Sequence, residues 1–144
     1  AFRPLREVTR LVIDTGPLVA LLNRRDRYHG WVRQVLGTVA PPLYTCEPVL
    51  SEACFLLGRL AGGQDAVLAL VAQDVVRVDF RFSAERAQVR GLMRKFASVP
   101  MSLADACLVR MTELEPQSVV LTLDADFRVY RRSRRKVIET IMPG

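Results

Sequence analysis

Four acidic side chains in this sequence lie within or directly after apolar segments, where a charge needs a partner. Asp14 follows LVI and Asp124 follows SVVLTL, while Glu52 and Asp105 lie in SEACFLL and SLADACLV. Burying a carboxylate is costly unless it is paired with a cation or binds a metal. Carboxylate oxygens are the ligands that Mg²⁺ and Mn²⁺ prefer. Together the four residues predict a site for a hard divalent cation.

Each acid also has an ordinary structural interpretation when it is taken singly. Asp14 could interact favourably with the dipole of the helix that follows it. Asp105 comes three residues after a serine, as in a capping box, and Glu52 could pair with an arginine. Asp124 and Asp126 could simply form a turn. We favour a functional set because four carboxylates on four separate segments, each beside apolar sequence, are hard to assemble by chance.

The segments that must position these acids alternate between strand and helix patterns. Short apolar runs predict strands, and Asp14 and Asp124 stand at the ends of two of them. Thr15 is expected to cap the first helix, with Pro17 in its first turn. The alternation predicts an α/β domain with a mostly parallel sheet covered on both faces, so both acids should lie at one edge. We expect strands at 11–13, 43–45, 75–78, 118–123 and, as a possible edge strand, at 137–138 with Ile141 beyond. Helices are expected at 15–22, 31–39, 48–60, 64–72, 83–97 and 102–114.

Length and hydropathy indicate one domain without a membrane segment. The 144 residues are expected to form a single domain, with residues 1–10 as an N-terminal extension and 131–136 as a basic segment. No apolar run approaches the roughly 20 residues that span a bilayer, and the start AFRPLREVTR has no apolar signal core. We therefore expect a cytoplasmic protein.

Cysteine and histidine usage excludes several kinds of site. Cys46, Cys54 and Cys107 form no CxxC pair, so neither a disulfide framework nor a thiolate zinc site is indicated. His29 is the single histidine, which excludes histidine acid–base pairs and HExxH zinc sites. We interpret His29 as an exposed residue at the start of a helix.

The positive charge of the chain is carried mainly by arginine. The net charge is +6, and only two of the 21 basic residues are lysines. Arginine forks onto phosphate better than lysine does, so nucleic acid is the partner to suspect, although these arginines could equally form a solvated surface. The candidates for phosphate contacts are Arg24, Arg25, Arg27, Arg128 and Arg131, with the further arginines up to position 135.

The acidic segments, taken in order, resemble the PIN-domain ribonucleases, and most of all the VapC-type toxins of toxin–antitoxin pairs. VIDTGPLVALL, VLSEACFLL, SLADACLV and TLDADF occur in the order and approximate spacing of that family. The resemblance implies a PIN fold, with a parallel sheet of about five strands flanked by helices. It also implies that Asp14, Glu52, Asp105 and Asp124 bind Mg²⁺ or Mn²⁺, with Asp126 as a supporting acid.

The function implied by this resemblance is metal-assisted hydrolysis of RNA phosphodiesters without a protein nucleophile. The implied partners are an RNA substrate and a protein antitoxin, and the chain could also form a homodimer. The alternative is a PIN-like module that binds RNA or protein without cutting. The complete set of four acids argues against that alternative, because a pure binding surface has no need to place carboxylates against RNA phosphates.

Overall fold

The computed structural model describes residues 10–144, so most of the expected N-terminal extension lies outside the described residues. The chain alternates between strands and helices, as its sequence pattern predicts. In order, the elements are β1 (Arg10–Ile13), α1 (Thr15–Leu22), α2 (His29–Leu36), β2 (Leu43–Thr45), α3 (Glu47–Leu56), α4 (Gly63–Ala72), β3 (Val76–Val78), α5 (Phe82–Lys95), α6 (Leu103–Leu114), β4 (Ser118–Leu121), the 3₁₀ turn η2 (Ala125–Arg128), β5 (Arg131–Arg132), β6 (Lys136–Val137) and β7 (Thr140–Ile141).

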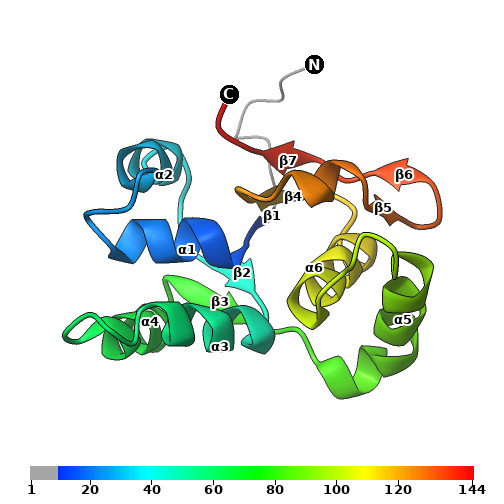
Figure 1. Cartoon of the computed structure of the whole chain (residues 1–144), viewed down its shortest axis with the longest axis horizontal. Helices are drawn as coiled ribbons and strands as arrows, with labels where there is room; N and C mark the ends of the chain where they lie inside the picture. The colour runs from blue at the N-terminus through cyan, green and yellow to red at the C-terminus, as the bar shows by residue number, and fades with distance from the viewer. Residues whose placement is uncertain (1–9) are drawn as a thin grey trace.

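Five strands form one parallel sheet in the order β3-β2-β1-β4-β7. The chain steps outward from β1 to β2 and β3, and then crosses back to β4 on the other side of β1. Parallel strands need such crossovers, and helices supply them. Figure 1 shows the result, with α1 to α4 on one side of the strands and α5 and α6 on the other. The predicted α/β class and five-stranded parallel sheet are confirmed.

The central strands are apolar because both faces of the sheet are covered. All four residues of β4 are buried, and so are three of the four in β1. Burial on both faces explains why these strands appear in the sequence as continuous apolar runs rather than alternating ones. β1 and β4 pair directly, with Ile13 opposite Leu121, so the segments that follow these two strands leave the sheet side by side.

Several local expectations differ from the structure: α2 ends at Leu36 rather than at position 39, and β4 ends at Leu121 rather than at position 123. Asp14, not Thr15, caps α1, because its carboxylate accepts the Thr15 N–H while Thr15 is already helical. The edge strand of the sheet is β7 rather than 137–138, because Val137 pairs with Arg131 in a separate antiparallel hairpin, β5–β6. Helix α3 ends at Leu56 instead of continuing to position 60, since a turn leads directly into α4.

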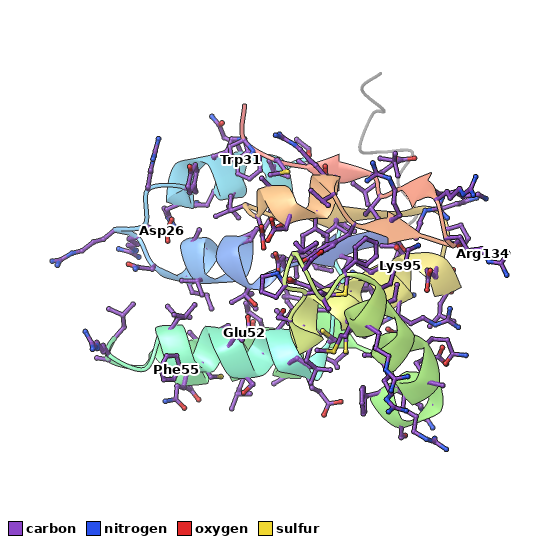
Figure 2. All side chains as sticks on the ribbon, turned by 45° about the vertical axis from the view of Figure 1, so that its right-hand side comes forward. Asp26, Trp31, Glu52, Phe55, Lys95 and Arg134 are labelled. Atoms are coloured by element: carbon purple, nitrogen blue, oxygen red, sulfur yellow. The ribbon has the colours of Figure 1, made fainter. Side chains whose placement is uncertain are left out.

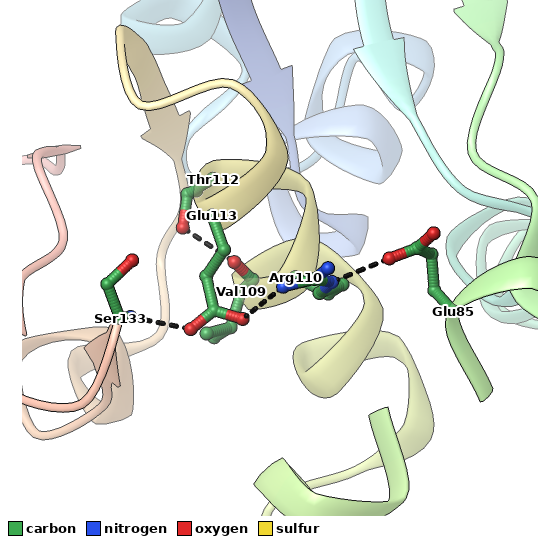
Figure 3. Close-up of polar contacts among 6 residues, drawn as sticks. All are labelled: Glu85, Val109, Arg110, Thr112, Glu113 and Ser133. Atoms are coloured by element: carbon green, nitrogen blue, oxygen red, sulfur yellow. Dashed lines mark hydrogen bonds and ion pairs between the residues drawn. The ribbon is translucent and has the colours of Figure 1, made fainter. Parts of the chain in front are cut away.

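A polar network ties α5, α6 and the β5–β6 hairpin together on the far side of the sheet (Figure 3). The Arg110 guanidinium of α6 donates to Glu85 of α5 at 2.7 Å and to Glu113 at 3.2 Å. Glu113 also accepts the backbone N–H of Ser133 in the hairpin at 2.5 Å. The half-buried cation thus has two carboxylate partners, and one of them fixes the hairpin.

Candidate active site

Five carboxylates line one cleft at the carboxyl ends of the central strands. Asp14 comes directly after β1, and Asp124 lies three residues after β4. Because these strands are neighbours, the two acids lie on the same edge of the sheet. The acidic cleft has a volume of about 480 Å³ and is lined by Asp14, Thr15, Gly16, Glu52, Leu56, Pro100, Ser102, Asp105, Leu123, Asp124 and Asp126.

Asp14 is the most deeply placed of the five acids, with 7% of its surface exposed. Its Oδ1 accepts the Thr15 N–H at 2.8 Å, and its Oδ2 accepts the Thr122 hydroxyl at 2.7 Å. Burial raises the pKa of Asp14 from 3.8 to about 6, although both hydrogen bonds oppose the shift. The nearby charges of Asp105 and Asp124 contribute to the same upward shift. The carboxylate therefore carries a charge that the surrounding protein does not compensate.

Glu52 reaches the cleft from α3 and is held by a residue of α1. The Thr15 hydroxyl donates to Glu52 Oε2 at 2.9 Å, across 37 positions of sequence. Figure 2 shows Glu52 between α3 and the first helix. Thr15 thus contacts two acids, one through its backbone N–H and the other through its side chain. The partner that the sequence required for Glu52 is a threonine and not an arginine.

Asp105 lies in the first turn of α6, where it both caps the helix and lines the cleft. The Asp105 N–H donates to the Ser102 hydroxyl at 3.0 Å, and the Ser102 N–H points back to Asp105 Oδ2 at 3.4 Å, which completes a capping box. The same Oδ2 accepts the Tyr130 hydroxyl at 2.8 Å. Burial is the main cause that raises the pKa of Asp105, and the charge of Asp124 adds to it.

Asp124 and Asp126 sit on the turn that begins η2. Asp124 Oδ1 accepts the Asp126 N–H at 2.9 Å, so Asp124 caps the 3₁₀ turn. The Asp124 N–H donates to the Thr122 hydroxyl oxygen at 2.9 Å, and that hydroxyl in turn donates to Asp14. Thr122 is fully buried and couples the two strand ends. The turn interpretation of these acids is correct as local structure, and it places both side chains in the cleft.

Tyr130 is a site residue that the sequence interpretation missed. Its ring is fully buried and packs edge-to-face against Phe96 and Phe127, with centroids 5.4 and 5.2 Å away. Burial and the adjacent Asp105 raise the pKa of the Tyr130 hydroxyl, so it remains a hydrogen-bond donor. The available signal was a tyrosine in an otherwise basic segment, since a buried tyrosine hydroxyl needs an acceptor.

The cleft has no internal counter-charge. Its lining includes five acids but no lysine, arginine or histidine. Within residues 10–144, no group of three or more histidine, cysteine or acidic side chains is already arranged to hold a metal ion. Mg²⁺ keeps several waters and needs only one or two direct carboxylates, so a spread set of acids in a wet cleft suits it. The chemistry of the donors thus fits a hard divalent cation.

The arginines between α1 and α2 lie outside the acidic cleft. Arg24, Arg25 and Arg27 are exposed, and none of them lines it. His29 begins α2, as expected, but it is half-buried, with Nδ1 2.7 Å from the Ala20 carbonyl oxygen. It therefore holds the two helices together rather than contacting the acids.

The basic segment after η2 is partly occupied by structural contacts. Arg128 is exposed, but the half-buried Arg131 donates through Nη1 to three backbone carbonyl oxygens of residues 128–130, at 2.7 to 3.0 Å. The carbonyl of Arg134 accepts from Lys95 Nζ at 2.5 Å, and Figure 2 shows the two residues together at the end of α5. The role of these arginines in RNA binding remains a prediction.

The fold and the site together define an α/β protein with an acidic centre at the carboxyl edge of a parallel sheet. The sequence matches the PIN domain family over residues 11–133, and the chain belongs to that family. This confirms the resemblance stated from the four acidic segments. No curated protein sequence matches the chain.

Two solved structures have folds similar to that of this chain. One is VapC20 of Mycobacterium tuberculosis, described as a sarcin-ricin loop cleaving toxin, with 25% identity, a TM-score of 0.73, and coverage of 83% of this chain and 93% of that one. The other is VapBC2 from Rickettsia felis bound to a promoter DNA fragment, with 12% identity, a TM-score of 0.60, and coverage of 94% and 100%. The second likeness concerns the fold alone.

No helix within 10–144 is both long and apolar enough to cross a bilayer.

Proposed function

We propose that the chain is a metal-dependent endoribonuclease whose acidic cleft hydrolyses RNA phosphodiesters. The observation that carries this proposal is the uncompensated charge of five carboxylates, one of them only 7% exposed, with no basic side chain among them. A bound cation would offset that charge. Asp14, Glu52, Asp105 and Asp124 would hold Mg²⁺ or Mn²⁺, and Asp126 would support Asp124.

The likeness to VapC20 supports RNA as the class of substrate. That protein is described as a toxin that cleaves the sarcin-ricin loop, and its fold covers most of this chain. We infer that the present chain is likewise a toxin that acts on RNA in the cytoplasm. Metal-assisted hydrolysis needs no protein nucleophile, so the nucleophile of the proposed reaction is water.

The protein's own contribution to the reaction is to orient the acids. When bound, the cation would lower the pKa of a water molecule and neutralise charge on the phosphoryl oxygens. Thr122 fixes the rotamer of Asp14, Thr15 directs Glu52 into the cleft, and Tyr130 holds Asp105. Each donor also stabilises the ionised carboxylate, which is the form that binds metal.

A protein antitoxin is the proposed partner, and the apolar face beside the cleft is the proposed place for it. Phe55 and Leu68 on α3 and α4 are 82% and 56% exposed, and Leu56 is 57% exposed while also lining the acidic cleft. Large exposed apolar side chains that adjoin one another indicate an interaction surface. A partner on this face would reach the rim of the cleft. A second copy of the chain is the competing occupant, and the mass of the purified complex distinguishes the two.

Cleavage of RNA by the purified chain tests the enzymatic proposal. The assay compares Mg²⁺, Mn²⁺ and EDTA, with Asp14→Asn and Asp105→Asn in parallel and Asp65→Asn as the control. Asp65 is an exposed acid in the first turn of α4, outside the cleft, so its substitution removes the same charge without touching the site. We expect metal-dependent cleavage that both cleft variants lose and the control keeps, with all three variants folded by circular dichroism.

The alternative is that the chain binds RNA or protein without cutting. It would be supported if the native chain bound RNA but left it intact with every metal tested. Cleavage that persisted in EDTA would refute metal dependence, and cleavage that persisted in both cleft variants would show that the acids are structural.

A further inference from the structure

A second depression, on α5, lies next to the acidic cleft and has the opposite charge. This α5 groove has a volume of about 590 Å³, and its main lining residues are Phe82, Arg86, Arg90, Met93, Arg94 and Leu103. The residues of α5 in this set recur at helical spacing of three and four, so they form one face of the helix. Val89 also lines the groove, and both Val89 and Leu92 are buried in the protein core. The groove is thus a built feature of an amphipathic helix.

Three arginines one turn apart give the groove its charge. Arg86, Arg90 and Arg94 are exposed, and no acidic residue lines the groove with them. Within residues 10–144, none of the three forms an ion pair, and the one side-chain hydrogen bond found among them is from Arg86 to the Ser83 carbonyl. Arg110 on the adjacent helix, in contrast, has two carboxylate partners. The three guanidinium groups are therefore available to an anionic ligand.

Apolar side chains line the groove together with these cations. Phe82 is 45% exposed and Leu103 is 43% exposed, while Met93 is half-buried. A purely solvated basic face needs no such surface. Proteins bind single-stranded nucleic acid by placing cationic side chains along its phosphate backbone and an aromatic ring on which a base can stack.

The segment that begins α6 contributes residues to both the groove and the cleft. Leu103 lines the α5 groove, and its neighbours Pro100 and Ser102 line the acidic cleft. A strand lying in the groove would therefore pass the start of α6 and meet the carboxylates. The cleft itself offers no basic side chain for the flanking phosphates. The arginines of the groove would supply these positive charges beside the cleft.

We propose that the α5 groove binds single-stranded RNA beside the scission site, with Arg86, Arg90 and Arg94 on phosphates and Phe82 stacked on a base. This inference rests on the proposed ribonuclease function, because the groove would hold the substrate strand on one side of the cleft in which that strand is cut. The three arginines of the groove were not among those singled out from the sequence. They form one surface only when α5 is helical and lies against α6.

Binding measured without cleavage tests the groove separately from the enzyme. A fluorescein-labelled RNA of about twelve nucleotides and mixed sequence is titrated in EDTA over a series of KCl concentrations, since single-stranded sites span roughly 4 to 16 nucleotides. The test variant is Arg90→Gln/Arg94→Gln. Its control is Arg33→Gln/Arg59→Gln, which removes the same charge from two exposed arginines outside both depressions. Thermal unfolding by circular dichroism verifies that all variants are folded.

We expect the groove variant to raise the Kd about tenfold or more and to lower the salt slope by about 1.4, which is about 0.7 for each lost phosphate contact. The control should change the Kd less than about threefold, by the general loss of charge alone. Phe82→Leu should raise the Kd about fivefold with an unchanged salt slope, because stacking on a base does not depend on released counterions.

Equal RNA affinities for the groove variant and its control would overturn the proposal, and so would a native chain that fails to bind the oligonucleotide at low salt. A groove variant that kept RNA but lost a labelled polyglutamate peptide would assign the groove to a protein partner instead. If RNA binding depends on the groove but no metal supports cleavage, the enzymatic proposal fails while the groove stands.

Discussion

Replacing Asp14 by asparagine should stabilise the metal-free protein at neutral pH. Burial raises the pKa of Asp14 from 3.8 to about 6, so its ionised form is disfavoured in the folded chain. At about 1.36 kcal/mol for a difference of one in pKa, this corresponds to roughly 3 kcal/mol against folding once the pH exceeds both values. Asparagine keeps the shape of the side chain and carries no charge.

Part of this gain is lost because an amide cannot accept both hydrogen bonds. Asp14 accepts from the Thr15 N–H and the Thr122 hydroxyl, whereas asparagine has one acceptor oxygen. A lost hydrogen bond of this kind costs about 1 kcal/mol. The net expectation for Asp14→Asn in EDTA at pH 7.5 is a gain of about 1 to 2 kcal/mol in the free energy of unfolding, or roughly 3 to 8 °C in Tm.

The dependence on pH follows from the sign of the pKa shift. An acid whose pKa is higher in the folded state weakens folding as the pH rises from about 4 to above 6. The advantage of Asp14→Asn should therefore be present at pH 7.5 and largely absent near pH 4, where the carboxyl is protonated in the folded chain and only about half ionised in the unfolded chain. The assay is urea unfolding in EDTA at these two pH values, with Asp65→Asn as the control.

Adding Mg²⁺ should reverse the order of stability. A ligand that binds only the folded chain stabilises it by RT ln(1 + [L]/Kd), about 2.7 kcal/mol at 100 times the Kd, which exceeds the expected advantage of the variant. The native chain should gain this stabilisation, and Asp14→Asn should gain little of it. A variant that is less stable than the native chain in EDTA at pH 7.5, or that responds equally to Mg²⁺, would refute the reasoning.

Three further substitutions test how the acids are held. Thr122→Val should cost about 1 to 3 kcal/mol in urea unfolding, since a buried carboxylate and a backbone N–H both lose their partner; a change below about 0.5 kcal/mol would contradict the coupling of the two strand ends. Tyr130→Phe should keep the packed ring but lower cleavage and raise the pKa of Asp105 further, which NMR titration would detect; an unchanged titration would show that the hydroxyl is not a significant donor. Glu113→Gln should speed hydrogen exchange at the β5–β6 hairpin while leaving cleavage intact, since its carboxylate joins Arg110 to that hairpin and is absent from the cleft lining; equal exchange rates would count against that link.

Several parts of the fold were predictable because their causes are local. The apolar runs before Asp14 and Asp124 indicate strands buried on both faces, and the structure has β1 and β4 there. The spacing of Ser102 and Asp105 indicates a capping box, which α6 has. Each of these signals involves residues only a few positions apart. The ends of some elements were predicted less accurately: α3 ends before position 60, and the edge strand of the sheet is β7.

The hydrogen bonds that orient the acids could not be deduced in this way. Thr122 lies 108 positions from Asp14, Glu52 lies 37 from Thr15, and Tyr130 lies 25 from Asp105. Nothing in the local pattern selects these pairs, because each depends on which strands are neighbours and how the helices cross the sheet. The same is true of the α5 groove, whose wall comes from the start of α6.

The sequence by itself determined the alternation of strands and helices, the order of the acidic segments and the family to which they belong, because periodicity, caps and turns depend on adjacent residues. The tertiary structure decided which donors hold each carboxylate, how far burial raises the pKa of Asp14, and which arginines share a surface. These properties depend on distance and solvent exposure, and only the packed chain fixes both.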